Sequence, residues 1–344
     1  MQKGSDALEK TIFSRDQEQT RLPFEKIERQ VLVRRECETD PAYGKRPEER
    51  TVEELIESGM LLINKPKGPT SHQVTEWAKN IVGIHRAGQA GTLDPSVTGL
   101  LPIALGRARK TLQVLLTAGK EYVCYMHLHS DMPHEQIRKV LEEKFVGRIR
   151  QLPPLKSAVK RQWRYRKIYY IDILDMDGRE ILFKVGCQAG TYIRKLCHDM
   201  GEALGCGAHM AQLIRTKSGG FRWEEMVTLH DLKDAYHEYQ NERNPVKLKN
   251  MLYPVEEIAR HLPKVWVCDD AVNPLANGLK LYAEMVAKAE TEIQKDELIA
   301  VMTLKDELIM FAESAMTSRD LVEQQGYAAK TVRVSMQTDV YPKL

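Results

Sequence analysis

Residues 88–99, which read GQAGTLDPSVTG, contain the acidic residue best suited to chemistry. The glycines allow positive φ, and the Asp94-Pro95 step restricts Asp94 to an extended backbone, so the loop has a defined shape. The apolar residues 100–105 follow as a rigid anchor. Composition alone favours a simpler interpretation, in which Asp94 only caps a turn or a helix.

Arg194 is the second candidate, in the segment GTYIRKL. Thr191 and Tyr192 indicate a change from strand to helix just before it. An arginine at such a point could pair with a buried carboxylate and keep it charged and oriented. Most arginines in this pattern are ordinary surface or interface residues, so the sequence leaves both interpretations open.

Positive charge is concentrated in residues 144–167, where nine basic residues occur and no acidic residue follows Lys144 until Asp172. The nine are Lys144, Arg148, Arg150, Lys156, Lys160, Arg161, Arg164, Arg166 and Lys167, and the aromatic residues Trp163, Tyr165, Tyr169 and Tyr170 interleave with them. Unneutralised like charges repel one another unless an anion binds. The pattern therefore favours a nucleic-acid groove over a solvated strand face with aromatic packing behind it.

The cysteines and histidines give little sign of a metal or of disulfides. Six cysteines occur without a C-x-x-C pair, which argues against a disulfide framework and a zinc ribbon and favours reduced thiols. The densest metal candidate is Cys197, His198, Cys206 and His209. Because HDMGEALGCGAH reads as a helix ending in a glycine-rich cap, we expect buried thiols and capping histidines there instead.

The elements that must position these residues intermix helix and strand. Residues 65–69, KPKGP, force a loop, and Ser71 is the expected N-cap of a helix over HQVTEWAKNIVG. Alternating apolar residues at 121–129 and 181–190 predict half-buried strands, and helical spacing resumes at 191–204. The expected class is α/β (α+β) with a mixed sheet.

The chain of 344 residues is long enough for two domains. Residues 1–50 carry 11 basic and 11 acidic side chains with few apolar ones, which predicts an extended arm. Beyond residue 261, short apolar runs around Lys305-Asp306 predict a β-hairpin in a small β-domain. We therefore expect an arm at 1–50, a catalytic domain at 51–260 and a β-domain at 261–344.

Overall charge is uninformative about partners, because 51 Lys and Arg against 48 Asp and Glu give a net charge of +3. No apolar run approaches the roughly 18 residues that a membrane span needs. The polar start MQKGSDALEK lacks the apolar region of a secretory signal. We expect a cytoplasmic protein without a membrane partner.

Ordered blocks from about Arg34 to Leu344 carry a family resemblance. They are INKPKGPTSHQV (63–74), GTLDPSVTGLLPIALGRA (91–108), AGTYIRKL (189–196) and AHMAQLIRTKSGGF (208–221), supported by QLPPLKSAVKR (151–161) and IAVMTLKDEL (299–308). The sequence resembles the TruB-like pseudouridine synthases, and among them the archaeal dyskerin homologues, the catalytic subunits of box H/ACA ribonucleoproteins. Several blocks in the family's order make chance similarity improbable.

The resemblance implies a pseudouridine synthase catalytic domain, a C-terminal PUA β-barrel and an arm packed on the PUA domain. It implies an enzyme that detaches uracil from ribose within RNA, rotates it and rejoins it through carbon, without cofactor or metal. The implied partners are an H/ACA guide RNA, substrate ribosomal RNA or tRNA, and small accessory proteins of the particle. Without a long Lys-rich tail, an archaeal form is favoured over a nucleolar one.

The resemblance also assigns roles to single residues. Asp94 matches the essential aspartate, Tyr122 the aromatic residue that stacks on the target base, and Arg194 the arginine that pairs with the aspartate. Four residues match motifs that support the site: Lys65 and Pro66 in the first motif, Leu213 and Arg215 in the third. RNA contacts are expected from Gln89, Lys156, Lys160, Arg161 and Arg164. A uridine must leave the RNA stack before any group reaches its glycosidic bond, which requires a stacking face and phosphate contacts.

Two segments differ from the family pattern. Gln89 and Ala90 occupy the H-x positions of H-x-G-T-L-D-P, where the flipped nucleotide is handled. In the β-domain, residues 277–279 and 283–285 replace the family's Gly-Ala and Pro-Gly elements. These differences bear on nucleotide handling and on guide-RNA contact.

Three alternatives to a guided enzyme remain open. A stand-alone tRNA pseudouridine synthase would not need the arm, and the arm and PUA pattern favour the guided enzyme. A non-catalytic RNA-binding scaffold would be consistent with Gln89 and Ala90. An unrelated hydrolase using Asp94 would need a second carboxylate nearby, and none occurs in the loop.

Overall fold

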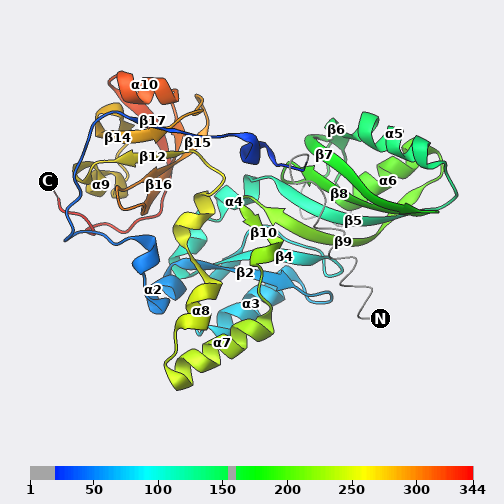
Figure 1. Ribbon diagram of the computed structural model, residues 1–344, viewed down its shortest axis with the longest axis horizontal. Helices are drawn as coiled ribbons and strands as arrows, with labels where there is room; N and C mark the ends of the chain where they lie inside the picture. The colour runs from blue at the N-terminus through cyan, green and yellow to red at the C-terminus, as the bar shows by residue number, and fades with distance from the viewer. Residues whose placement is uncertain (1–19, 154–159, 344) are drawn as a thin grey trace.

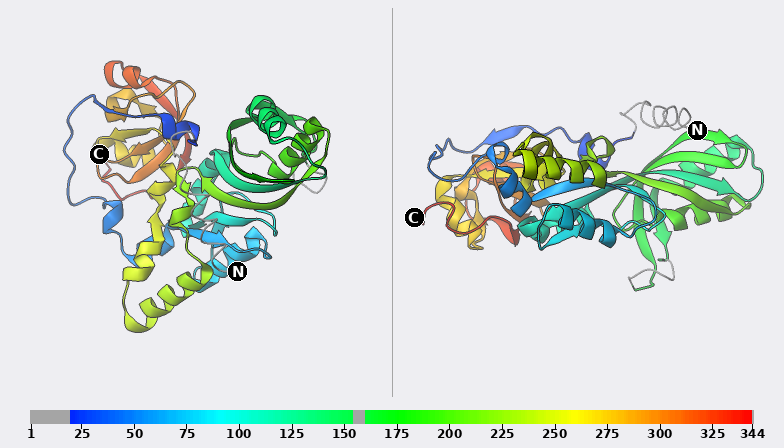
Figure 2. Two further views of the ribbon diagram at one scale, coloured as in Figure 1. Left: turned by 45° about the vertical axis from the view of Figure 1, so that its right-hand side comes forward. Right: turned by 90° about the horizontal axis from the view of Figure 1, so that it is seen from below.

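The computed structural model describes residues 20–153 and 160–343, whose strands form two sheets (Figure 1). The larger sheet has ten strands and the smaller one seven. Each combines antiparallel pairs with a parallel pair, so the predicted mixed α/β class is confirmed. In the view from below, the molecule is elongated, with the small sheet at one end (Figure 2).

The larger sheet lies within the segment expected to be catalytic. Its strands are β2 (Gly59–Lys65), β3 (Ala87–Gln89), β4 (Thr98–Leu105), β5 (Lys120–Leu128), β6 (Gly147–Gln151), β7 (Arg164–Asp177), β8 (Glu180–Cys187), β9 (Ala208–Ser218), β10 (Phe221–Arg222) and β11 (Leu252–Pro254). The main order is β11-β2-β4-β9-β5-β8-β7-β6, with β3 paired to β4 and β10 to β9. The strands predicted at 121–129 and 181–190 are confirmed as β5 and β8.

Two groups of helices cover the two halves of this sheet. The helices are α2 (Val52–Glu57), α3 (Ser71–Ile81), α4 (Gln113–Thr117), α5 (His134–Phe145), α6 (Ile193–Leu204), α7 (Leu229–Glu242) and α8 (Val246–Met251). Residues of α5 and α6 share one core with β5, β7, β8 and β9, whereas α3 and α7 share another with β2 and β4. The parallel contact of β4 with β9 joins the halves, and the candidate catalytic loop lies at this joint.

The N-cap of α3 corrects one prediction. Thr70, not Ser71, caps the helix, because the Thr70 hydroxyl accepts a hydrogen bond from the Gln73 amide. Ser71 is the first helical residue, and its hydroxyl bonds to a distant loop. Thr and Ser are similar N-caps, so adjacent candidates cannot be separated by residue type.

The small sheet combines the C-terminal domain with one strand of the arm. Its strands are β1 (Val31–Val33), β12 (Lys264–Val267), β13 (Leu281–Tyr282), β14 (Val286–Glu290), β15 (Leu298–Met302), β16 (Leu308–Ser314) and β17 (Tyr327–Val334), with α9 (Asp269–Ala276) and α10 (Ser318–Glu323) beside them. The predicted hairpin is confirmed as the antiparallel pair β15 and β16. Asp306 in its turn has a φ of 64°.

The arm packs on the C-terminal domain, as the resemblance implies. Strand β1 pairs antiparallel with β14, and the Arg34 guanidinium donates to the carbonyls of Leu321 and Gln324. A disulfide joins Cys37 of the arm to Cys268, which corrects the expectation of reduced thiols for these two cysteines, whereas the other four are free. The two cysteines are 231 positions apart in sequence, so no local spacing could reveal them.

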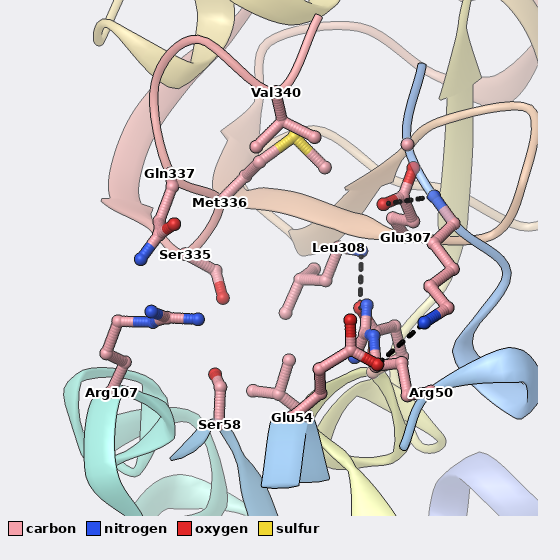
Figure 3. A pocket seen from close by; sticks show the side chains of 14 residues that line it. Arg50, Glu54, Ser58, Arg107, Glu307, Leu308, Ser335, Met336, Gln337 and Val340 are labelled. Carbon is pink, nitrogen blue, oxygen red and sulfur yellow. Dashed lines mark hydrogen bonds and ion pairs between the residues drawn. The ribbon is translucent and has the colours of Figure 1, made fainter. Parts of the chain in front are cut away.

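A cavity of about 340 Å³ marks where the arm, α2 and the C-terminal domain meet (Figure 3). The Arg50 guanidinium forms two hydrogen bonds of 2.7 Å to the Glu256 carboxylate, which also accepts from the Leu308 amide at 3.0 Å. Lys45 pairs with Glu54 at 2.8 Å. These contacts join the end of the arm to α2 and to the segment after β11, and that segment to β16. Among the described residues, no helix has the length and apolar character needed to cross a membrane.

Candidate active site

Asp94 lies on the loop between β3 and β4. Its carbonyl accepts from the Val97 amide at 3.0 Å and closes a tight turn. Gly99, with φ of 100°, begins the close approach of β4 to β9, where a Cβ would collide with the backbone of Arg215. Only glycine tolerates both the positive φ and the close approach of the neighbouring backbone at this position. The backbone of the loop is thus fixed while the Asp94 side chain stays 51% exposed.

Two buried polar side chains support the loop from below. The Lys65 ammonium group, fully buried, donates to the carbonyls of Pro66 and Val97 at 2.9 Å and of Pro95 at 3.3 Å. Burial lowers the pKa of Lys65, and the nearby Asp94 carboxylate opposes that shift. The Ser71 hydroxyl donates to the Leu93 carbonyl at 3.0 Å and accepts from its amide at 2.8 Å. Lys65 and Pro66 therefore lie where the first motif predicts loop support.

Arg194 lies in the first turn of α6, and its guanidinium donates to the Asp94 carboxylate. The carboxylate thus pairs with Arg194, whereas the turn is closed by the Asp94 backbone carbonyl. The simpler interpretation of Asp94 as only a cap does not describe this geometry. The two side chains are 55% and 51% exposed, so the pair is open to solvent in the protein alone.

Tyr122 and Arg215 face each other across strands β5 and β9. The Arg215 guanidinium is fully buried and donates to the carbonyls of Leu100 at 2.7 Å and Gly91 at 3.3 Å. Burial lowers the pKa of Arg215, and Tyr122 opposes this shift; burial raises the pKa of the Tyr122 phenol. Tyr122 is therefore neutral at physiological pH.

Leu213 lies in the apolar core that includes residues of the loop. It is buried on β9 and belongs to the same core cluster as Leu93 and Val97, which flank Asp94. Tyr122 packs against that cluster. The residues expected to support the site thus gather around the loop, although their proposed roles remain predictions.

Among the residues expected to contact RNA, Gln89 ends β3 just before the Asp94 loop, whereas Lys160, Arg161 and Arg164 belong to the basic segment. Gln89 accepts a hydrogen bond from the Thr75 hydroxyl at 3.0 Å, which holds its side chain against α3. Lys160 and Arg161 are exposed, and Arg164 is half-buried beside the Lys160 carbonyl. Lys156 lies outside the described residues. The RNA contacts of all these residues remain predictions.

The aromatic residues of the basic segment divide into two pairs. Trp163 and Tyr165 are both 54% exposed, and the guanidinium carbons of Arg150 and Arg148 lie 4.4 Å and 3.8 Å from their ring centroids. Tyr170 is buried and donates to the Glu121 carboxylate. Tyr169 is half-buried. The segment thus combines an exposed face of cations and rings with aromatic packing behind it.

The candidate metal cluster does not form in the part of the chain that the structure describes, where no group of three or more His, Cys, Asp or Glu could hold a metal ion. The Cys197 sulfur lies 3.5 Å from that of Cys124 in the core. His209 instead contacts His129 on the surface, with 3.0 Å between their ring nitrogens. Helix and strand direct the four candidate side chains to different places.

Sequence reasoning missed two contributors to the site. Ser71 was interpreted only as a helix cap, although its hydroxyl holds Leu93, which is 22 positions away. Glu121 accepts from Thr216 at 2.7 Å behind the strands that carry Tyr122 and Arg215. An acidic residue inside an otherwise apolar strand, directly before Tyr122, was the available signal, but its partners depend on the sheet register.

Comparison with protein families gives four matches along the chain. They are the DKCLD (NUC011) domain at residues 19–75, the TruB family pseudouridylate synthase N-terminal domain at 79–193, the tRNA pseudouridylate synthase B C-terminal domain at 194–260, and the PUA domain at 263–335. The second match contains Asp94, Tyr122 and the strands of the basic segment.

Individual relatives match over nearly the whole chain. The probable tRNA pseudouridine synthase B of Methanopyrus kandleri is 50% identical over 94% of this chain and 95% of its own length. That of Pyrococcus abyssi is 47% identical over 96% of this chain and its own full length. Among solved structures, a chain of a Cbf5-Nop10-Gar1 complex is 46% identical, with a TM-score of 0.89 over 95% of this chain and 99% of its own. A chain of an H/ACA RNP bound to a substrate RNA containing 2'-deoxyuridine is 44% identical, with a TM-score of 0.87 over 94% and 99%. By sequence, domain content and fold, the chain belongs to the TruB-like pseudouridine synthases with DKCLD and PUA domains.

Proposed function

We propose that the chain catalyses the RNA-guided isomerisation of uridine to pseudouridine in ribosomal RNA, as the catalytic subunit of an H/ACA ribonucleoprotein. The observation that carries this proposal is the Asp94–Arg194 pair on a supported loop. The chain also matches a chain of an H/ACA RNP bound to substrate RNA over 94% of its length. The solved relatives favour a guide RNA, a substrate RNA and small accessory proteins as partners.

The chemistry needs a carboxylate that is fixed in place yet reachable. The reaction breaks the bond from the uracil nitrogen to ribose, forms a bond from a uracil carbon to ribose, and transfers a proton from that carbon to the nitrogen. Asp94 attacks either the ribose or the pyrimidine ring, and Arg194 orients it. Half of the Asp94 side chain is free to meet an extruded uridine.

Binding of RNA would change the surroundings of this pair. A base stacked on Tyr122 would cover the loop and displace water from the carboxylate and guanidinium. Electrostatic interactions strengthen when water is excluded, so Asp94 and Arg194 would interact more strongly in the complex than in the free protein. The chain's own residues supply all of these roles, and the resemblance implies no cofactor or metal.

Phosphate contacts come from the basic segment in this proposal. Lys160, Arg161 and Arg164 are close in sequence to the exposed rings of Trp163 and Tyr165, on which Arg150 and Arg148 stack. Cations beside exposed aromatic rings suit a single RNA strand. Lys156 and Gln89 belong to the same proposal as RNA contacts. A cytoplasmic location, expected from the sequence, also stays a prediction.

A stand-alone tRNA pseudouridine synthase is the second candidate, because the curated relatives are named as probable tRNA enzymes. A non-catalytic scaffold is less well supported. Gln89 replaces the family's histidine but bonds to Thr75 on α3, and the Asp94–Arg194 pair forms regardless.

The deciding experiment measures pseudouridine formation by the purified chain on a ribosomal RNA fragment and on a tRNA, each with and without guide RNA. We expect turnover on the ribosomal fragment only with the matching guide. Turnover on tRNA without a guide would favour the stand-alone enzyme. Absence of turnover on every RNA, with accessory proteins present, would favour the scaffold.

A further inference from the structure

A cavity of about 310 Å³ is lined by residues of α5, β6 and α6 and by Trp163, which directly precedes β7. These elements lie together in the outer lobe of the large sheet (Figure 1). Its floor is formed by Phe145 and Ile149, each 9% exposed. Its walls are Trp163 and the charged residues Lys144, Arg148, Arg150, Lys195 and Asp199. This volume is at the lower end of the range of ligand pockets, about 300–1,000 Å³, so a single small group would fill it.

The charges around this cavity are unbalanced. Lys195 and Asp199 neutralise each other as an ion pair along α6. Within residues 20–153 and 160–343, no carboxylate pairs with Lys144, Arg148 or Arg150. Three cations at one cavity repel one another unless an anion binds, so the expected ligand carries negative charge.

The cavity also has a stacking element already assembled. The Arg150 guanidinium lies over the Trp163 ring at 4.4 Å, and the indole is 54% exposed. A further planar group can stack on a guanidinium that already lies on an aromatic ring. Unstacked RNA bases bind to aromatic rings and to arginine planes in this way. An apolar floor, a stack and surrounding cations together match one nucleotide better than an acidic peptide.

The cavity is linked to the candidate catalytic pair through one helix. Arg194, which pairs with Asp94, is followed directly by Lys195, which lines the cavity. The Gln151 side chain, at the end of β6, accepts from the Tyr192 amide at 3.1 Å and donates to its carbonyl at 3.2 Å, which fixes β6 to the start of α6. A group in the cavity is therefore held in a fixed position relative to Asp94.

We propose that this cavity binds one unpaired nucleotide of the substrate strand, close to the target uridine. Its base extends the Arg150–Trp163 stack over Phe145 and Ile149, and its phosphates lie among Lys144, Arg148 and Arg150. The inference rests on the proposed function, since it deepens the recognition of the same RNA. It adds a subsite that selects strands able to place an unstacked nucleotide beside the target.

The test is a double-mutant cycle between protein and RNA, with the full chain assembled on guide RNA. Substrate strands carry a single abasic position, moved stepwise along both sides of the target uridine, and affinity is measured in an Asp94→Asn background. In the protein that retains Trp163, we expect one position of the substrate strand where removal of the base weakens binding about 5- to 150-fold. This loss is the equivalent of one base–aromatic stack of about 1–3 kcal/mol. In Trp163→Ala the same removal should change affinity by no more than about twofold, because the stacking ring is already absent.

Two variants serve as controls. Trp77→Ala removes another exposed tryptophan, 46% exposed on α3, and should leave every abasic effect unchanged. Trp163→Phe keeps an aromatic face and should retain the position-specific effect, which separates stacking from loss of folding. The proposal would be overturned if Trp163→Ala bound the RNA with wild-type affinity, or if base removal had equal effects with and without Trp163. It would also be overturned if Trp163 were coupled only to the guide strand, or if the protein bound no RNA at all. Binding is measured without turnover, so the two proposals can fail separately. If the Asp94→Asn protein shows the coupling but the protein with Asp94 intact never forms pseudouridine, only the proposed function is refuted.

Discussion

A buried chain of charged groups connects the N-terminal arm to the active-site strands, and it allows a quantitative prediction. The Lys217 ammonium nitrogen on β9 lies 3.0 Å from a carboxylate oxygen of Glu25 in the arm and 3.5 Å from one of Glu121 on β5. The exposed fractions of the Lys217, Glu25 and Glu121 side chains are 13%, 7% and 4%. Glu121 directly precedes Tyr122 on β5, so the arm is coupled to the strand that carries this tyrosine.

We predict that Lys217→Met destabilises the protein by about 3 kcal/mol. Removing one partner of a buried ion pair costs about 3–5 kcal/mol, because the other charge stays buried without compensation. The lower end applies here, since Arg222 still pairs with Glu25 at 2.7 Å and Thr216 still donates to Glu121 at 2.7 Å. The expected loss corresponds to roughly a 150-fold change in the unfolding equilibrium.

The assay is urea unfolding of the full chain at neutral pH, followed by circular dichroism and by proteolysis of the arm. Lys247→Met is the matched control, because Lys247 pairs with Glu238 on the surface, where its side chain is 65% exposed, and should hardly change stability. Lys217→Met should also lower turnover more than RNA affinity. A first unfolding transition within about 0.5 kcal/mol of the wild type would refute the claim that this buried pair holds the arm.

Three further outcomes test the site, the RNA surface and the domain junction. Asp94→Asn should reduce pseudouridine formation below roughly 1% of wild type with RNA affinity unchanged, because it removes the reactive carboxylate but keeps the size; higher residual turnover in a single-turnover assay would exclude Asp94 as the catalytic group. Joint replacement of Lys160, Arg161 and Arg164 by Gln should reduce the salt dependence of RNA binding by about one unit of slope for each phosphate that is no longer neutralised, and an unchanged slope would indicate a solvated face. Burial lowers the pKa of His261 from 6.5 to about 4, so as pH falls from 6.5 to 4 the unfolded chain gains a proton that the folded chain does not. Stability should therefore fall by up to about 3 kcal/mol over this range, and His261→Gln should remove that part of the pH dependence of urea unfolding.

Local sequence was sufficient for elements whose cause is local. The alternation at 121–129 and the hairpin around Asp306 arise from residue spacing and turn chemistry, and both were predicted. The pairing of Arg194 with Asp94 was suggested by residue type and made specific by the family resemblance. The Cys37–Cys268 disulfide could not be predicted, because it depends on where the arm runs along the C-terminal domain.

The individual bonds that support the candidate catalytic loop could not be derived from local sequence, although the family resemblance named Lys65 and Arg215 as supporting residues. A short, solvated loop has too few contacts of its own to hold a carboxylate in one orientation. Here Lys65, Ser71 and Arg215 come from three separate elements and bond to backbone groups of the loop or its flanks. Because these bonds lie beneath the loop, its outer side stays open, and Asp94 remains half exposed for an incoming nucleotide. The rigidity and the accessibility of the carboxylate therefore have different sources, and a substitution in the buried support should lower turnover without removing any group that touches RNA.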